Sequence, residues 1–207
     1  MNWQCAAYRL PAAGSKQDQE AWMPHRRSTT SSSNAGTALL MADAVEYLAS
    51  AALIGTGATI VMDIWGMVRA HLLGVPSLDY ALVGRWLGHL ASGRLRHDRI
   101  AASPQVTGER VIGWIAHYLI GIGFAGLLLA IFGLDWARQP TIGPALLVGI
   151  GSVAAPFLVM QPAMGAGIAA SRTPHPWAAR LQSLVTHAVF GGGLYAAGWI
   201  GRLSSSW

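Results

Sequence analysis

The sequence predicts an all-α integral membrane protein, a four-helix bundle with a short interfacial helix in its first cytoplasmic loop. Two observations support this prediction. The chain of 207 residues is 53% hydrophobic and only 11% charged, whereas an average soluble domain is about 25% charged. Its 25 glycines and its lack of long strand-like alternation are typical of helices that pack through small residues.

Four apolar stretches are long enough to cross a hydrocarbon core, which takes ~20 helical residues. They cover residues 45–68, 110–134, 142–161 and 178–200. Helix-breaking residues mark the ends of these stretches. Gly74 and Pro76 follow the first, Pro140 precedes the third, and Pro174 and Pro176 separate the third from the fourth. We therefore expect four spanning helices.

Residues 1–40 differ in composition from the rest of the chain. They contain the low-complexity run from Ser28 to Ser33 and no apolar run long enough for a signal-peptide core. We expect a disordered extension over residues 1–40 and a membrane domain over residues 41–207. Met41 opens a conventional start directly before the first apolar stretch, so the extension is either an upstream-start artefact or a real flexible tail.

The loop between the first and second stretches has a helical pattern of its own. Ser77 can cap a short helix. Five apolar residues would share one face of that helix: Tyr80, Val83, Trp86, Leu87 and Leu90. We expect the helix to lie in the membrane interface, as an anchor or as a lid over a membrane site.

The arginines predict the orientation of the chain in the membrane. Eight of them follow the first or the third stretch: Arg69, Arg85, Arg94, Arg96, Arg99, Arg110, Arg172 and Arg180. Without the extension, only Arg138 and Arg202 lie on the other side; the extension adds four basic residues there. We expect both long loops in the cytoplasm and both termini outside.

The basic balance of the chain does not indicate nucleic-acid binding. The net charge is +5, but the basic residues lie in loops and do not form the clustered face that phosphate backbones require. We expect the lipid bilayer as the partner, and no nucleic acid. The lone Cys5 excludes a disulfide within the chain.

Each apolar stretch carries one conspicuous polar side chain: Asp63, His117, Gln161 and His187. If the stretches alternate in direction, all four lie in the cytoplasmic half of the bilayer. At 1.5 Å of rise per residue, Asp63 and His117 each lie ~10 Å from the cytoplasmic end of their helix. An ionisable group inside a membrane costs ~2.5 to 3.5 kcal/mol for Asp, so it marks a functional site by default.

Three roles are open for these polar residues. Asp63 beside His117 or His187 would form a pair that holds or passes a proton, with Gln161 in support. The same Asp and His residues, with Met160, offer an alternative transition-metal site. The third role is structural, since a buried carboxylate paired with a histidine can hold helices together.

An enzyme is not expected. The chain has no metalloprotease, serine-hydrolase or nucleotide-binding signature, and no cofactor is implied. We expect a protein that handles a proton, ion or small solute through the polar residues, or else a structural or accessory protein that binds another membrane protein or itself as a homodimer.

Four strings in the chain are long enough to be specific for a family. They are Ile64-Trp65-Gly66, the runs from Leu78 to His89 and from Ala116 to Gly121, and the segment from Pro156 to Pro174. These strings resemble domain-of-unknown-function family 2938, an uncharacterised bacterial membrane-protein family, over about residues 44–201. The resemblance implies a multi-span protein of the bacterial inner membrane, and it brings no catalytic residues.

Overall fold

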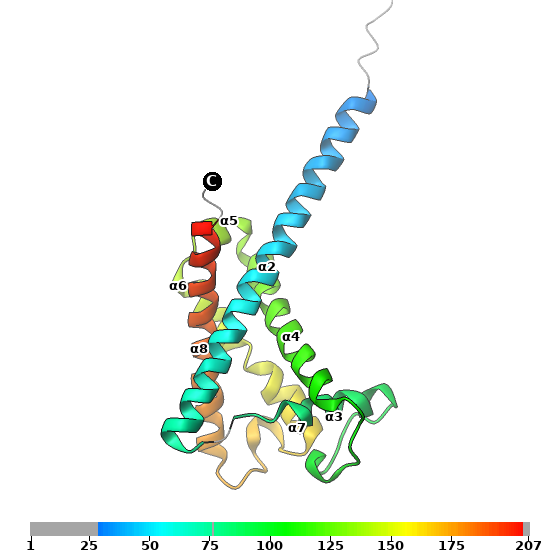
Figure 1. The fold of residues 1–207 in the computed structure, drawn as a ribbon, viewed down its shortest axis with the longest axis vertical. Helices are drawn as coiled ribbons and strands as arrows, with labels where there is room; N and C mark the ends of the chain where they lie inside the picture. Colours follow the sequence, from blue (N-terminus) through cyan, green and yellow to red (C-terminus); the bar gives the residue numbers. More distant parts are fainter. Residues whose placement is uncertain (1–28, 76, 205–207) are drawn as a thin grey trace, which may run out of the picture. The chain divides into compact units, whose positions relative to one another are not determined.

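A computed structural model describes residues 29–75 and 77–204 of the chain, with side chains from residue 36 onward. The described residues form helices and no strand (Figure 1), which confirms the predicted all-α class. The chain divides into two compact units, residues 1–43 and 44–207.

The first unit contains the beginning of α2 (Thr29–Leu73). Most of the predicted disordered extension, residues 1–28, lies outside the described residues. Residues 29–40 differ from that prediction because they are helical. Their second half is rich in alanine and leucine, which are strong helix formers.

Three helical stretches are long and apolar enough to cross a membrane: Gly36–Leu73 in α2, Glu109–Phe132 (α4) and Ile142–Met164. The third is a composite of α6 (Ile142–Gly151), the π-helix η2 (Pro156–Met160) and α7 (Gln161–Met164). Proline lacks the backbone N–H that an α-helix needs, so Pro156 accounts for the change in helical winding at this point.

The predicted fourth span corresponds to α8 (Pro176–Ser204), which has 29 residues. Its length suffices to cross a membrane. It is less apolar than the other three, because arginines, His187 and a run of glycines lie along it, and it is not among the three candidate spans. A membrane-crossing role for α8 stays a prediction.

Four short helices connect these stretches: α3 (Tyr80–Ala91), η1 (Ile100–Ala102), α5 (Leu134–Arg138) and η3 (Ile168–Ala170). The predicted cap of α3 is wrong. Asp79 is the N-cap, and its carboxylate accepts the Ala81 N–H at 3.0 Å. Ser77 instead donates its hydroxyl to the Gly66 carbonyl at 3.0 Å, so it fastens the loop to α2.

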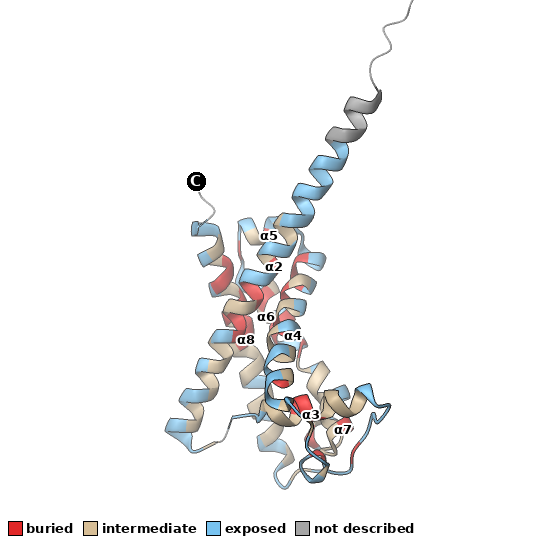
Figure 2. Cartoon of the chain, turned by 45° about the vertical axis from the view of Figure 1, so that its right-hand side comes forward, coloured by how far each residue is buried: buried red, intermediate tan, exposed pale blue. Residues whose placement is uncertain are grey.

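The core of the second unit lies where α2, α4, α6 and α8 meet, and Figure 2 shows the buried residues gathered there. Leu128, Leu129 and Leu194 are almost completely buried. Glycines let the helices approach closely at their contacts. A Cβ added to Gly149 would overlap the Gly191 backbone, so α6 and α8 touch through their main chains.

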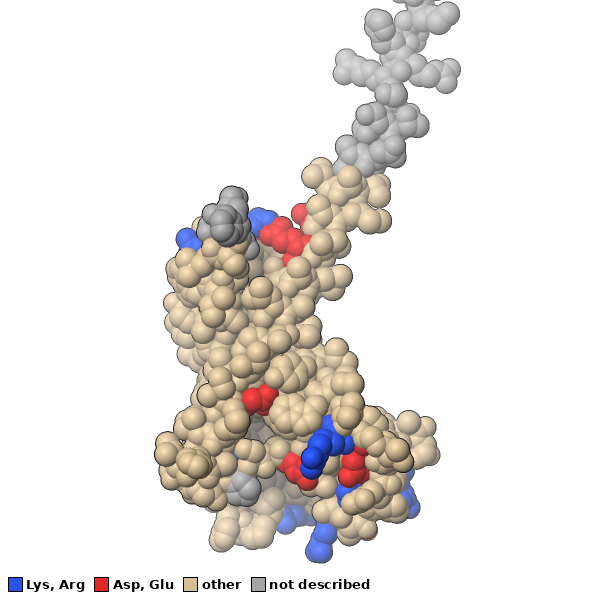
Figure 3. Space-filling view, in the orientation of Figure 1, with Lys and Arg blue, Asp and Glu red and all other residues tan. Residues whose placement is uncertain are grey.

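The surface of the second unit is apolar over a broad band. Large hydrophobic side chains are exposed on α2, α4, α6 and α8, among them Leu119, Ile131 and Leu147. Figure 3 shows a wide region without Lys or Arg between charged groups at its upper and lower ends. A contiguous exposed apolar surface of this kind marks a protein that contacts a membrane or another protein.

Candidate functional site

The carboxylate of Asp63 lies among three ring side chains. Its Oδ1 is 2.9 Å from His117 Nε2 and accepts the Tyr80 hydroxyl at 3.2 Å. Its Oδ2 accepts the Tyr118 hydroxyl at 3.1 Å. The Tyr80 oxygen is also 2.9 Å from His117 Nε2. We call Asp63, Tyr80, His117 and Tyr118 the Asp63 cluster.

Close packing of α2 against α4 brings Asp63 to His117. A Cβ added to Gly121 would overlap the Thr59 side chain, and one added to Gly55 would overlap the backbone of α4. Asp63 lies one helical turn beyond Thr59, and His117 one turn before Gly121. Asp63 and His117 therefore meet one helical turn away from the point where Thr59 touches Gly121.

Tyr80 reaches the cluster because α3 packs on the first turns of α4. A Cβ added to Gly84 would overlap the Glu109 carbonyl, and one added to Gly113 would overlap the Tyr80 carbonyl. The Tyr80 ring stacks on the His117 ring with centroids 4.2 Å apart. α3 therefore contributes a residue to the site as well as packing against the helix that carries His117.

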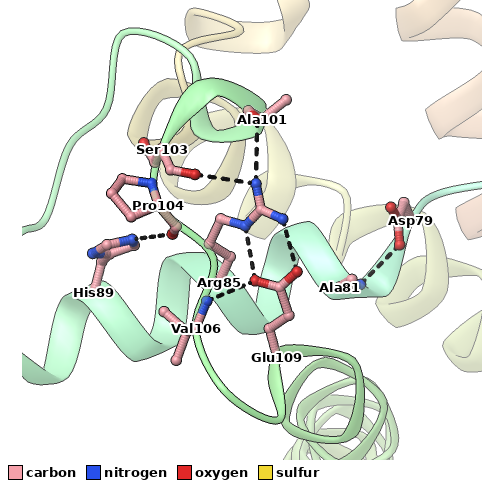
Figure 4. A network of polar contacts seen from close by, with 9 residues as sticks. All are labelled: Asp79, Ala81, Arg85, His89, Ala101, Ser103, Pro104, Val106 and Glu109. Carbon is pink, nitrogen blue, oxygen red and sulfur yellow. Dashed lines mark hydrogen bonds and ion pairs between the residues drawn. The ribbon is translucent and has the colours of Figure 1, made fainter.

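A buried ion pair anchors α3 beside the start of α4 (Figure 4). Arg85 donates from Nε and Nη2 to the two Glu109 oxygens, at 2.8 and 2.7 Å. Its Nη1 donates to the carbonyls of Ala101 and Ser103 at 3.2 and 3.3 Å. Hydrogen bonds to Glu109 raise the pKa of Arg85, because they favour its charged form. The pair ties α3, the following loop and α4 together, which holds Tyr80 in place.

The Asp63 cluster is largely shielded from solvent. The side chains of His117 and Asp63 are 12% and 15% exposed. Burial, followed by the charge of Asp63, raises the pKa of Tyr80, so its phenol keeps its proton at neutral pH. Tyr80 is therefore a hydrogen-bond donor to the cluster.

Hydrogen-bond chemistry limits the protonation states of the Asp63 cluster. An ionised Asp63 accepts hydrogen bonds but cannot donate them, so His117 must carry its hydrogen on Nε2 for their contact to be a hydrogen bond. When His117 is doubly protonated and its Nε2 proton moves to Asp63, the ring becomes neutral with its remaining hydrogen on Nδ1. Nε2 is then the acceptor, and either Asp63 or Tyr80 can donate to it. The same heavy-atom positions therefore accommodate the proton on either His117 or Asp63.

His187 makes its hydrogen bond with Ser152 and not with Asp63. Ser152, which is 3% exposed, donates its hydroxyl to the Gly149 carbonyl at 2.6 Å. Its oxygen lies 2.7 Å from His187 Nδ1. Since the hydroxyl has only one hydrogen, His187 donates from Nδ1. A neutral His187 then has a lone pair on Nε2.

Gln161 lies at the start of α7, directly after the π-helix. Its Oε1 is buried without a hydrogen-bond partner among the described residues. Of the four polar residues singled out in the sequence, the structure joins Asp63 and His117. His187 has a different partner, and Gln161 has none for its side-chain oxygen.

The alternative metal set of Asp63, His117, His187 and Met160 is not assembled. In the described ranges, no group of three or more His, Cys, Asp or Glu side chains lies close enough together to hold a metal ion. The physical reason is position. His187 lies at the contact of α8 with α6, beside Ser152 and Gly149, whereas Asp63 and His117 meet at the contact of α2 with α4.

Sequence reasoning missed Tyr80 and Tyr118 as partners of Asp63, and Ser152 as the partner of His187. Tyr118 had a usable signal, because it follows His117 directly and a buried phenol normally finds a hydrogen-bond partner. Tyr80 was placed on the apolar face of the interfacial helix, where its hydroxyl received no role. Ser152 carried no local signal that distinguishes it from other small residues between helices.

No curated protein and no solved structure matches the chain significantly. Residues 52–201 match the family described as a protein of unknown function (DUF2938). This range includes the whole Asp63 cluster, as well as Ser152 and His187. The match covers well over half of the 207 residues, so the chain belongs to the DUF2938 family.

Proposed function

We propose that this protein lies in the bacterial inner membrane and handles a proton, or a solute that moves with a proton, at the Asp63 cluster. The observation that carries the proposal is the triangle of Asp63 Oδ1, His117 Nε2 and the Tyr80 oxygen, with separations of 2.9 to 3.2 Å. A proton can be accommodated on either Asp63 or His117 within this triangle.

The residue types suit reversible protonation. An imidazole titrates at about pH 6.5 when unperturbed, and its charge is strongly affected by a neighbouring carboxylate. An isolated charge is costly at membrane depth. Without an added proton, Asp63 and His117 together carry a net negative charge. Binding of one proton converts them to a neutral ion pair or to two neutral groups. Proton binding is therefore favoured electrostatically at this depth.

The arginine distribution supports an orientation with the Asp63 cluster in the cytoplasmic half of the membrane. Tyr80 belongs to the first long loop, so it would link the cluster to the cytoplasmic surface. Four helices enclose little space for a solute, and transport across the whole membrane would therefore need a homodimer. A strictly monomeric protein in mild detergent would count against transport.

A structural role is the second candidate. Both oxygens of Asp63 accept hydrogen bonds, and the donors come from α3 and α4. This complete pairing suits a carboxylate that holds three helices together. Under this alternative, removal of the Asp63 charge costs stability but abolishes no transport activity.

Asp63→Asn distinguishes the two candidates because it keeps the shape of the side chain and removes its charge. Proton flux would be followed with a pH-sensitive dye in proteoliposomes, beside a thermal unfolding midpoint in detergent. Asp135→Asn is the matched control, because the Asp135 side chain is 93% exposed.

Proton handling predicts that Asp63→Asn stays folded and loses the flux, while Asp135→Asn keeps it. The structural alternative would be established by two results together. The unmodified protein would give no more flux than empty liposomes, and Asp63→Asn would have a lower unfolding midpoint.

A further inference from the structure

Two nitrogen donors on α2 are buried without an acceptor. They are the Nε of Arg69 and the Nε1 of Trp65, neither of which has a hydrogen-bond partner among the residues described. The two residues are four positions apart in one helix, so their side chains lie on the same side of α2, one turn apart.

Arg69 differs from the arginines that explain membrane orientation. Arg94, Arg96 and Arg172 are exposed, as basic residues at a membrane surface usually are, whereas Arg69 is half-buried. Arg85 is buried but has a carboxylate partner at 2.7 Å. No ion pair of Arg69 occurs in the described part of the chain.

A guanidinium group stays charged in proteins, so loss of a proton does not remove this mismatch. A buried donor without an acceptor is destabilising, and the effect is larger for a charged group. Among the described residues, this side of α2 therefore offers no acceptor to the Trp65 Nε1 and Arg69 Nε donors.

Arg69 also lies within electrostatic range of the Asp63 cluster. Burial and the charge of Asp63 raise the pKa of Tyr80, and the positive charge of Arg69 acts in the opposite direction. Asp63 already accepts three hydrogen bonds from its own cluster. An additional anion beside Arg69 would thus be close enough to interact with the proton held by that cluster.

We propose that Arg69 and Trp65 form a binding site for a phosphate-type oxyanion. The Nε–H of a guanidinium and a neighbouring Nη–H form a fork that binds two oxygens of one anion. The indole N–H supplies a third donor, and a phosphate group has enough oxygens for all three. The anion is a free phosphate or the phosphate of an anionic lipid headgroup. Binding of the anion does not depend on the proposed function. Transport of the anion as the solute would rest on that function.

The test measures binding by the full-length protein in nanodiscs of neutral phosphatidylcholine. One arm titrates radiolabelled inorganic phosphate, and the other exchanges phosphatidylglycerol into the nanodisc and counts retained lipid by native mass spectrometry. Arg69→Gln removes the charge and the fork, Arg69→Lys keeps only the charge, and Trp65→Phe removes only the indole donor. Arg96→Gln is the matched control, because Arg96 is exposed.

Arg69→Gln is expected to weaken binding by roughly 10- to 100-fold, the equivalent of one charge-assisted hydrogen bond. Arg69→Lys should give an intermediate loss and Trp65→Phe a smaller one, while Arg96→Gln should bind normally. If Arg69→Gln fails to fold, Arg69→Lys and Trp65→Phe still provide the comparison.

Arg69-dependent binding of inorganic phosphate supports the site and identifies a free anion as the source. Arg69-dependent retention of phosphatidylglycerol alone supports the site and identifies the lipid. Binding of both probes that is equal in all variants, or no binding of either, overturns the proposal.

These outcomes are separate from those of the flux experiment. Arg69-dependent binding without any proton flux would refute the proposed function and leave the anion site. A flux that depends on Asp63, without Arg69-dependent binding, would refute the anion site and leave the proposed function.

Discussion

Gly84→Ala tests how the site depends on the contact between α3 and α4. The added Cβ would overlap the Glu109 carbonyl and would come within 2.7 Å of the Gly113 nitrogen. Both neighbours are backbone atoms, so no side chain can rotate away. Overpacking of this kind costs up to about 3 kcal/mol, and the better helix propensity of alanine returns about 1 kcal/mol. We expect a net loss of about 2 kcal/mol.

The assay is the apparent thermal unfolding midpoint in mild detergent, with two further glycine variants for comparison. The three atoms nearest to a Cβ added at Gly88 all belong to the Val106 side chain, which can move, so Gly88→Ala should cause a smaller loss. Gly123→Ala has no neighbouring atom within 4 Å and should cause no loss. Gly84→Ala should also reduce proton flux, because separation of α3 from α4 withdraws Tyr80. Equal midpoints for Gly84→Ala and Gly123→Ala would refute this reasoning.

Two other changes test the loop around α3. Arg85→Gln should lower the unfolding midpoint more than Arg138→Gln, because the Arg85 pair is buried whereas the Arg138 side chain is 56% exposed and such surface pairs contribute little; similar shifts would contradict this. Burial, together with the charges of His89 and Arg94, lowers the pKa of His97. Since the unfolded chain then binds a proton more readily than the folded one, stability should fall as the pH drops below about 6.5. The midpoint, measured from about pH 8 to about pH 5, should fall less steeply in His97→Phe, and an identical pH dependence would show that His97 is not responsible.

The helical class and three membrane-length helices follow from local properties of the sequence. A run of about 20 apolar residues has few alternatives to a helix in a membrane. Helical rise also predicted that Asp63 and His117 lie at similar distances from the ends of their helices. Their contact needs only that α2 and α4 be neighbours.

The rest of the site depends on contacts between distant segments. Tyr80 reaches Asp63 because Gly84 and Gly113 allow α3 to pack on α4, and neither glycine reveals its partner in the sequence. His187 was expected at a similar depth to Asp63, but depth does not determine on which side of a helix bundle a residue lies. Its hydrogen bond to Ser152 comes from the contact of α6 with α8.

The partner of Arg85 was equally hidden. Arg85 belongs to the arginines that predict the orientation of the chain, whereas the structure buries its side chain against Glu109. Membrane orientation depends on where arginines lie along the sequence, and this count does not separate a surface arginine from a paired one. Arg69 shows the same ambiguity, since only the structure reveals that its Nε has no hydrogen-bond partner among the described residues.

The most direct test of proton sharing in the Asp63 cluster is a solid-state NMR measurement of the ¹⁵N resonances of the His117 ring in lipid bilayers. We predict that Nε2 carries a hydrogen and that its resonance shifts in both Asp63→Asn and Tyr80→Phe. The His187 resonances should stay unchanged, because that ring is paired with Ser152. A His117 resonance that is the same in the unmodified protein and both variants would contradict the account.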